Sequence, residues 1–158
     1  MELQIKAAEH AQIPQLVGLW KELMEHHTAL DPYFEMSEAG PSNFERFVSS
    51  ILLLEDARIL VALDGPIVVG YCIGQVVTRP PVFKREVHGF ITDMTVTASC
   101  RRRGVGDRLL AGMLEWFRTK NMDRIELNVV PGNAAGYSFW RKQGFRDYMH
   151  VLYRETGK

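Results

Sequence analysis

The run Arg101-Arg102-Arg103-Gly104-Val105-Gly106 has the composition of an anion-binding turn. It follows an apolar stretch typical of a strand and precedes a helical pattern that begins at Asp107-Arg108-Leu109. The first turn of a helix has backbone N–H groups without intrahelical partners, so a phosphate there gains hydrogen bonds and about 0.3–1 kcal/mol from the helix dipole. Glycines permit close approach of the backbone, and arginines add positive charge. The sequence therefore predicts a phosphate site at this turn.

Two common phosphate motifs do not match the turn. A P-loop requires Gly-x-x-x-x-Gly-Lys followed by Ser or Thr, and the chain has no such run. The dinucleotide fingerprint requires a third glycine three positions after the second, and Gly106 is followed by Asp107, Arg108 and Leu109. Taken alone, the three arginines could equally be a solvated charge run.

A second motif lies downstream of the turn: Asn133-Ala-Ala-Gly-Tyr-Ser-Phe-Trp140-Arg-Lys-Gln-Gly144-Phe145. Together with Arg101-x-x-Gly104-x-Gly106 it resembles the two ordered signatures of the GCN5-related N-acetyltransferase (GNAT) family. The resemblance covers residues 67–153, whereas the N-terminal third matches only in general layout.

The resemblance implies acetyl-CoA as co-substrate and no metal ion. In the family the turn holds the pyrophosphate, and backbone N–H groups of the preceding strand meet the pantetheine and the thioester carbonyl. A hydrogen bond to such a carbonyl can lower the barrier by about 2.7–4 kcal/mol. The cofactor-binding residues implied for this chain are Met94, Thr95, Val96, Arg101, Arg102, Arg103, Gly104, Val105, Gly106, Asn133 and Trp140.

Acetylation of an amine requires the neutral amine, and an amine of lysine type, with a pKa near 10.4, is mostly protonated at neutral pH. Many relatives carry a carboxylate in the strand before the turn, which makes Asp93 the first candidate for the base. A carboxylate of ordinary pKa is a weak direct base, so we expect it to act through a water molecule or by orienting the ammonium group. Glu126 is a competing candidate, and a structural hydrogen-bond role for Asp93 also stays open.

The acid that protonates the leaving thiolate is where this chain departs from the family. The family's tyrosine falls at Trp140, whose indole donates a hydrogen bond but does not deliver a proton. Tyr137 lies four residues after Asn133 on the same helical face and could substitute, or could simply pack beside the cofactor. Solvent could also protonate the thiolate, because a thiol of pKa near 8.5 is a tolerable leaving group.

These residues favour an acetyl-CoA-dependent N-acetyltransferase that acts on a primary amine of a small molecule or peptide by direct attack. One alternative is a catalytically silent acyl-CoA-binding sensor or subunit, motivated by Trp140. A nucleic-acid-binding role for the arginines is disfavoured by the net charge of zero and the lack of a nucleic-acid motif.

Composition and length restrict the remaining possibilities. At 158 residues the chain fits a single domain over 1–158, and it has neither a signal-peptide core nor an apolar run that could span a membrane, so we expect a cytoplasmic protein. Residues 1–56 hold three Lys/Arg against ten Asp/Glu, and residues 57–158 hold sixteen against nine. This asymmetry suits a polyanionic cofactor and a cationic acceptor, although solvated helix faces would also explain the acidic part.

The elements needed to position the motifs can be read from periodicity. We expect strands at 2–7, 58–63, 67–78, 89–97 and 124–130, with one or two more within 145–154. We expect helices at 10–27, 43–54 (capped by Ser42 or Asn43), 105–120 and 133–142, the last ended by Gly144. The order βααβββαβαβ(β) predicts an α/β (α+β) GNAT fold with a mixed, mostly antiparallel sheet of six to seven strands flanked by about four helices. The family often dimerises, and the apolar segment Met149–Tyr153 could contribute an edge to a homodimer.

Overall fold

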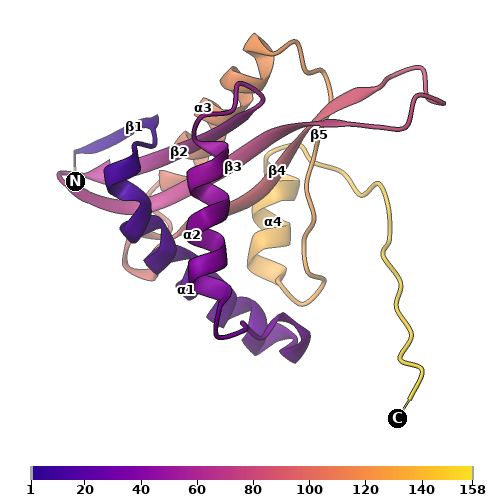
Figure 1. The fold of residues 1–158 in the computed structure, drawn as a ribbon, viewed down its shortest axis with the longest axis horizontal. Coiled ribbons are helices and arrows are strands. Elements are labelled where there is room, and N and C mark those ends of the chain that lie inside the picture. The colour runs from indigo at the N-terminus through magenta and orange to yellow at the C-terminus, as the bar shows by residue number, and fades with distance from the viewer. Residues whose placement is uncertain (1, 158) are drawn as a thin grey trace. The chain divides into compact units, whose positions relative to one another are not determined.

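The computed structural model describes residues 2–157, and the chain divides into two compact units, Met1–Asn128 and Val129–Lys158. Figure 1 shows the first unit as a twisted sheet with helices packed against it. The expectation of one domain over the whole chain stays a prediction.

The sheet of the first unit has five strands in the order β1-β2-β3-β4-β5. They are β1 (Leu3–Ala7), β2 (Ala57–Asp64), β3 (Ile67–Thr78), β4 (Val87–Val96) and β5 (Ile125–Glu126). The first four pair antiparallel and β5 joins β4 in parallel, so the predicted mixed, mostly antiparallel sheet is confirmed. The predicted count of six to seven strands is wrong for the described residues.

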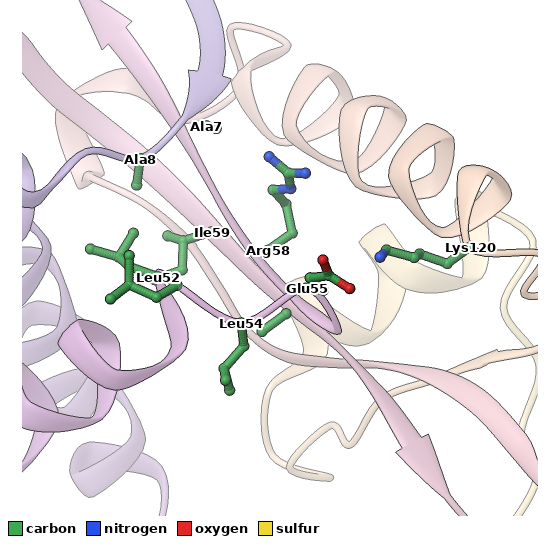
Figure 2. Close-up of a pocket in the computed structure, with 10 residues that line it drawn as sticks. Ala7, Ala8, Leu52, Leu54, Glu55, Arg58, Ile59 and Lys120 are labelled. Carbon is green, nitrogen blue, oxygen red and sulfur yellow. The ribbon is translucent and has the colours of Figure 1, made fainter.

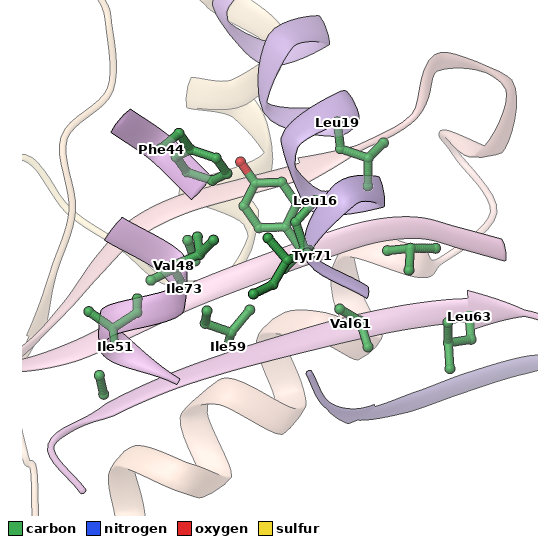
Figure 3. Packing of buried hydrophobic residues seen from close by; sticks show 13 residues of the cluster. Leu16, Leu19, Phe44, Val48, Ile51, Ile59, Val61, Leu63, Tyr71 and Ile73 are labelled. Carbon is green, nitrogen blue, oxygen red and sulfur yellow. The ribbon is translucent and has the colours of Figure 1, made fainter. Parts of the chain in front are cut away.

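The helices α1 (Ile13–Leu30) and α2 (Gly40–Ile51) cover one face of the sheet. Figure 3 shows the core beneath them, where Leu16 and Val48 from the helices pack with Tyr71 and Ile73 of β3. The helix α3 (Val105–Thr119) covers the opposite face, because a Cβ atom built at Gly70 would lie 3.2 Å from Leu109 of α3. Alternate residues of β3 thus face the α1–α2 layer and the α3 layer.

Two helices begin away from their predicted positions. A 3-10 turn at His10–Gln12 precedes α1, so the α-helix itself starts three residues later than expected. Helix α2 starts at Gly40, with Pro41 in its first turn, rather than at the expected cap of Ser42 or Asn43. Proline favours the first helical position because its missing N–H has no intrahelical partner there in any case. Two further 3-10 turns lie at Pro32–Phe34 and Ala98–Cys100.

The second unit contains one described helix, α4 (Ala134–Lys142). Asn133 caps it by accepting a hydrogen bond from the Gly136 amide at 3.0 Å, and Gly144 follows it in the left-handed conformation, with φ of 91°. The end of the helix at Gly144 was predicted, whereas the capping role of Asn133 was not. The strands expected within 145–154 are absent from the described residues, where that segment is irregular and Met149 and Leu152 are exposed. Among residues 2–157, no helix has both the length and the apolar character that a membrane span requires.

Candidate active site

The predicted phosphate turn joins β4 to α3 through two residues in the left-handed conformation. Gly104, the N-cap of α3, has φ of 76°, and Arg102 has φ of 58°. The first helical hydrogen bond runs from the Arg108 amide to the Gly104 carbonyl at 3.1 Å, so the amides of Val105 and Gly106 precede the helical ladder. The turn thus combines available backbone donors with the positive end of a 15-residue helix. This arrangement fits a pyrophosphate group.

The three arginines of the turn differ in their surroundings. The Arg101 side chain folds back, its Nε donating to the Val96 carbonyl at 2.9 Å while its terminal nitrogen lies 3.5 Å from the Glu22 carboxylate in α1. The side chains of Arg102 and Arg103 are exposed. Two cationic groups therefore face solvent beside the turn, while Arg101 is held by the protein itself.

The strand before the turn has a partner strand on one side only along most of its length. β4 pairs with β3 from Val87 to Val96, but with β5 only at Gly89 and Phe90. Met94, Thr95 and Val96 lie beyond the last β5 pair, and alternate backbone groups of a strand point to each of its edges. This part of β4 therefore has an edge without a strand partner among the described residues, as the family resemblance implied.

Asp93 lies on the same part of β4, opposite Ile73 of β3. A register shift between Ile73 and Gly74 makes Thr92 an extra residue, and the bulge turns Asp93 to the face that carries Tyr71. Burial raises the pKa of Asp93 to about 7, and the nearby Tyr71 hydroxyl acts in the opposite direction. That hydroxyl is buried and lies beyond ordinary hydrogen-bond geometry from any described partner. A carboxyl group of this pKa can accept a proton near neutral pH.

Glu126, the competing candidate, is engaged by its neighbours. Arg124 donates to it at 2.7 Å, and Nε2 of His88 lies 3.5 Å from its second oxygen. It also pairs with Phe90, three residues before Asp93 in β4. These contacts give Glu126 a structural role and leave Asp93 as the better candidate for the base.

In the second unit, the candidate acid Tyr137 donates its hydroxyl proton to Asp147 at 2.9 Å. This hydrogen bond raises the pKa of Tyr137, which makes it a weaker acid. Trp140 packs edge-on against Phe145, with ring centroids 5.3 Å apart. The oxygen of Asn133 is used by the cap of α4. Each of these side chains thus has a local packing or capping role.

A pocket of about 400 Å³ lies at the other end of α3 (Figure 2). Arg58 at the start of β2 and Lys120 after α3 line it, together with Leu52, Glu55 and residues at the end of β1. Fifteen helical residues separate Lys120 from the turn, which corresponds to about 22 Å. The pocket is therefore distinct from the candidate active site. Among residues 2–157, no group of three or more His, Cys, Asp or Glu side chains is placed to hold a metal ion.

Sequence reasoning missed Glu22. Besides its contact with Arg101, its carboxylate accepts hydrogen bonds from the Thr97 hydroxyl at 3.1 Å and from the Ala98 amide at 2.9 Å. Glu22 precedes these partners by 75 and 76 positions, so no local pattern could have paired them.

Comparison with known proteins identifies the family of this chain. The model of the acetyltransferase (GNAT) family matches residues 20–145. The chain belongs to this family. A curated relative, L-2,4-diaminobutyric acid acetyltransferase of Shouchella clausii (strain KSM-K16), is 30% identical over 137 residues, which are 87% of this chain and 73% of the relative.

Solved structures of lower identity share the fold of this GNAT protein. A mutant of the BH1408 protein of Bacillus halodurans superposes with a TM-score of 0.85 at 20% identity, covering 96% of this chain and 98% of its own. The aminoglycoside N-acetyltransferase AAC(6')-Iy in complex with CoA has a TM-score of 0.75 at 16% identity, covering 98% of this chain and all of its own. The mixed α/β architecture of the family is therefore present in this chain.

Proposed function

We propose that this GNAT protein transfers the acetyl group of acetyl-CoA to a primary amine of a small molecule by direct attack. The observation that carries the proposal is the continuous path along β4. The strand presents the carboxyl group of Asp93, then an edge without a β5 partner at Met94–Val96, and then the anion-binding turn. The polyanionic part of acetyl-CoA fits the turn, and its acyl chain fits the strand edge.

Acetyl-CoA supplies the thioester whose carbonyl carbon is attacked, so that a C–N bond forms, the C–S bond breaks and the thiolate leaves. On this chain, the backbone N–H groups of Met94–Val96 would polarise the carbonyl. Asp93 would receive the proton that the amine loses, either directly or through one water molecule. Solvent would protonate the thiolate, because the Tyr137 hydroxyl already donates to Asp147.

We further propose that the acceptor carries a second cationic group. The curated relative is named for a substrate with two amino groups, and the solved relative for aminoglycosides, which carry several. The first 56 residues hold ten acidic against three basic residues, which would favour such acceptors over neutral amines. A peptide amine is the other acceptor class that the sequence leaves open. Because its proposed co-substrate is acetyl-CoA, we also propose that the protein works in the cytoplasm.

The test is an assay of thiol release from acetyl-CoA with 2,4-diaminobutyrate, an aminoglycoside, a lysine-containing peptide and, as matched control, 2-aminobutyrate, which lacks the second amine. Turnover with the diamine or the aminoglycoside and little with the monoamine is the expected result. Turnover with the monoamine at an equal rate would contradict the cationic-acceptor proposal.

A silent acyl-CoA-binding sensor is the second candidate. It is favoured by Trp140 at the position of the family's tyrosine and by the contact of Tyr137 with Asp147. Calorimetric binding of acetyl-CoA without turnover on any acceptor would support the sensor, and any acceptor-dependent thiol release would exclude it.

A further inference from the structure

A single carboxylate, that of Glu22, connects helix α1 to the segment that leads from β4 into the phosphate turn. One of its oxygens accepts from the Thr97 hydroxyl at 3.1 Å. The other accepts from the Ala98 amide at 2.9 Å and lies 3.5 Å from a terminal nitrogen of Arg101. These three donors span the whole 3-10 turn between strand and arginine run.

The contacts of Arg101 link the same segment back to β4. We call this set of contacts among Glu22, Thr97, Ala98 and Arg101 the brace. Its Nε donates to the Val96 carbonyl at the end of β4, while its terminal nitrogen points to Glu22. The Thr97 amide is in turn bonded to the Val69 carbonyl of β3 at 2.9 Å. The segment Val96–Arg101 is therefore fixed at both ends, to the sheet and to α1.

We propose that Glu22 is a positioning residue for acetyl-CoA: it holds the phosphate turn in its binding shape and aligns Arg101 before the cofactor arrives. The inference rests on the proposed function, because it concerns the same cofactor site. In this proposal Glu22 acts through the turn, because its carboxylate oxygens contact Thr97, Ala98 and Arg101. A negative charge beside an anion site would repel the anion, and the adjacent Arg101 guanidinium offsets that repulsion.

The brace orders the turn before the cofactor binds. Hydrogen bonds to a charged group each stabilise a structure more than neutral ones do, and Glu22 makes them while only partly exposed, at 34% of its side chain. Without them, the turn would sample other conformations. The apparent affinity for acetyl-CoA would then fall in proportion to the fraction of time that the turn still spends in its binding shape. Loss of this brace should weaken acetyl-CoA binding about tenfold, the equivalent of one such hydrogen bond.

The experiment is calorimetric titration of acetyl-CoA into wild type, Glu22→Ala, Glu22→Gln, Arg101→Ala and the double variant Glu22→Ala/Arg101→Ala. Glu25→Ala is the matched control, because Glu25 is an exposed glutamate of the same helix. We expect about tenfold weaker binding for Glu22→Ala, and no change for Glu25→Ala. The double variant should bind no more weakly than the weaker single variant, since both residues belong to one brace.

Two further readouts separate positioning from a loss of fold. Amide hydrogen exchange of Val96–Gly106 in the cofactor-free protein should become faster in Glu22→Ala, whereas exchange in β2 and β3 should not change. Kinetically, the KM for acetyl-CoA should rise while kcat stays within about twofold. If Glu22→Ala fails to fold, Glu22→Gln decides, because it keeps the size and an acceptor but removes the charge opposite Arg101.

The outcomes distinguish the two proposals. Wild type that does not bind acetyl-CoA would overturn the proposed function and this inference with it. Wild type that binds, with Glu22→Ala and Glu22→Gln binding as well as Glu25→Ala, would overturn the role of Glu22 and leave the proposed function standing.

Discussion

Replacing Asp93 with Asn should make the protein more stable above neutral pH and nearly inactive. Burial raises the pKa of Asp93 from 3.8 to about 7, so the folded protein binds a proton that the unfolded chain releases between these values. Stability therefore falls as pH rises through this window, and above it the folded protein bears the full cost of the buried charge. A shift of this size corresponds to at most about 4 kcal/mol, and because solvent reaches part of the side chain we expect about 1–2 kcal/mol.

The effect on turnover should have the opposite sign. A general base acts only when deprotonated, so kcat/KM should rise with pH and level off above about pH 7 in the wild type. Asp93→Asn should lose this dependence and lower turnover about 10²- to 10⁴-fold, with little change in acetyl-CoA affinity. The two measurements are urea unfolding below about pH 5 and above about pH 8, and thiol release over the same range.

Together, the unfolding and thiol-release measurements test whether Asp93 instead has only a structural role. If the carboxylate served only as a structural hydrogen-bond acceptor, Asp93→Asn would lower stability at high pH and leave turnover intact. Glu126→Gln is the matched control and should keep the pH dependence. If Glu126→Gln lost the pH dependence of kcat/KM and Asp93→Asn kept it, the base would be Glu126 and not Asp93.

Three further predictions concern packing, the acid and the thiols. Gly89→Ala places a Cβ atom 2.6 Å from the Phe117 ring of α3 and should destabilise the fold by about 1–3 kcal/mol in urea unfolding, whereas Gly18→Ala, with nothing within 4 Å, should be neutral or stabilising. Tyr137→Phe should change the rate of thiol release less than about threefold, and a loss of about 10²-fold or more would restore it as the acid. Cys72 is buried, which raises its pKa, so a thiol reagent should modify the partly exposed Cys100 and leave Cys72 unmodified until the protein unfolds.

The parts of the fold that were predicted well depend on local signals. The β2–β3 hairpin was predicted from the apolar runs 58–63 and 67–78 on either side of a short turn, and Gly65 in that turn has φ of 58°. The limits of α3 follow from the glycine turn before it and from the apolar stripe along it, which buries Leu109 and Met113. Such signals lie within a few residues of the element they define.

The errors arise where an element depends on distant partners. Residues 124–130 alternate as a strand should, yet only Ile125 and Glu126 pair, because β4 offers them only Gly89 and Phe90. Helix α2 begins before its expected cap, and Gly40 lies where a Cβ atom would be 3.3 Å from Trp20 of α1. In the structure, the Ser42 hydroxyl instead donates to the Ala39 carbonyl within the first turn. The short pairing of β5 and the approach of Gly40 to Trp20 have no local signature, whereas Pro41 in the first turn of α2 is a local signal.

The position of Asp93 shows why the candidate site could be named from the sequence but not explained by it. Strict alternation along β4 would place Asp93 on the same face as Gly89 and Ile91, and a Cβ atom on the partner residue Gly74 would be 2.9 Å from Phe117 of α3. A carboxylate on that face would be enclosed by apolar side chains, without access to an acceptor. The single extra residue, Thr92, reverses the alternation and brings Asp93 beside the Tyr71 hydroxyl, where burial raises its pKa without removing it from solvent. On the proposed function, the bulge is therefore what keeps this carboxylate, whose pKa burial raises, accessible to an acceptor.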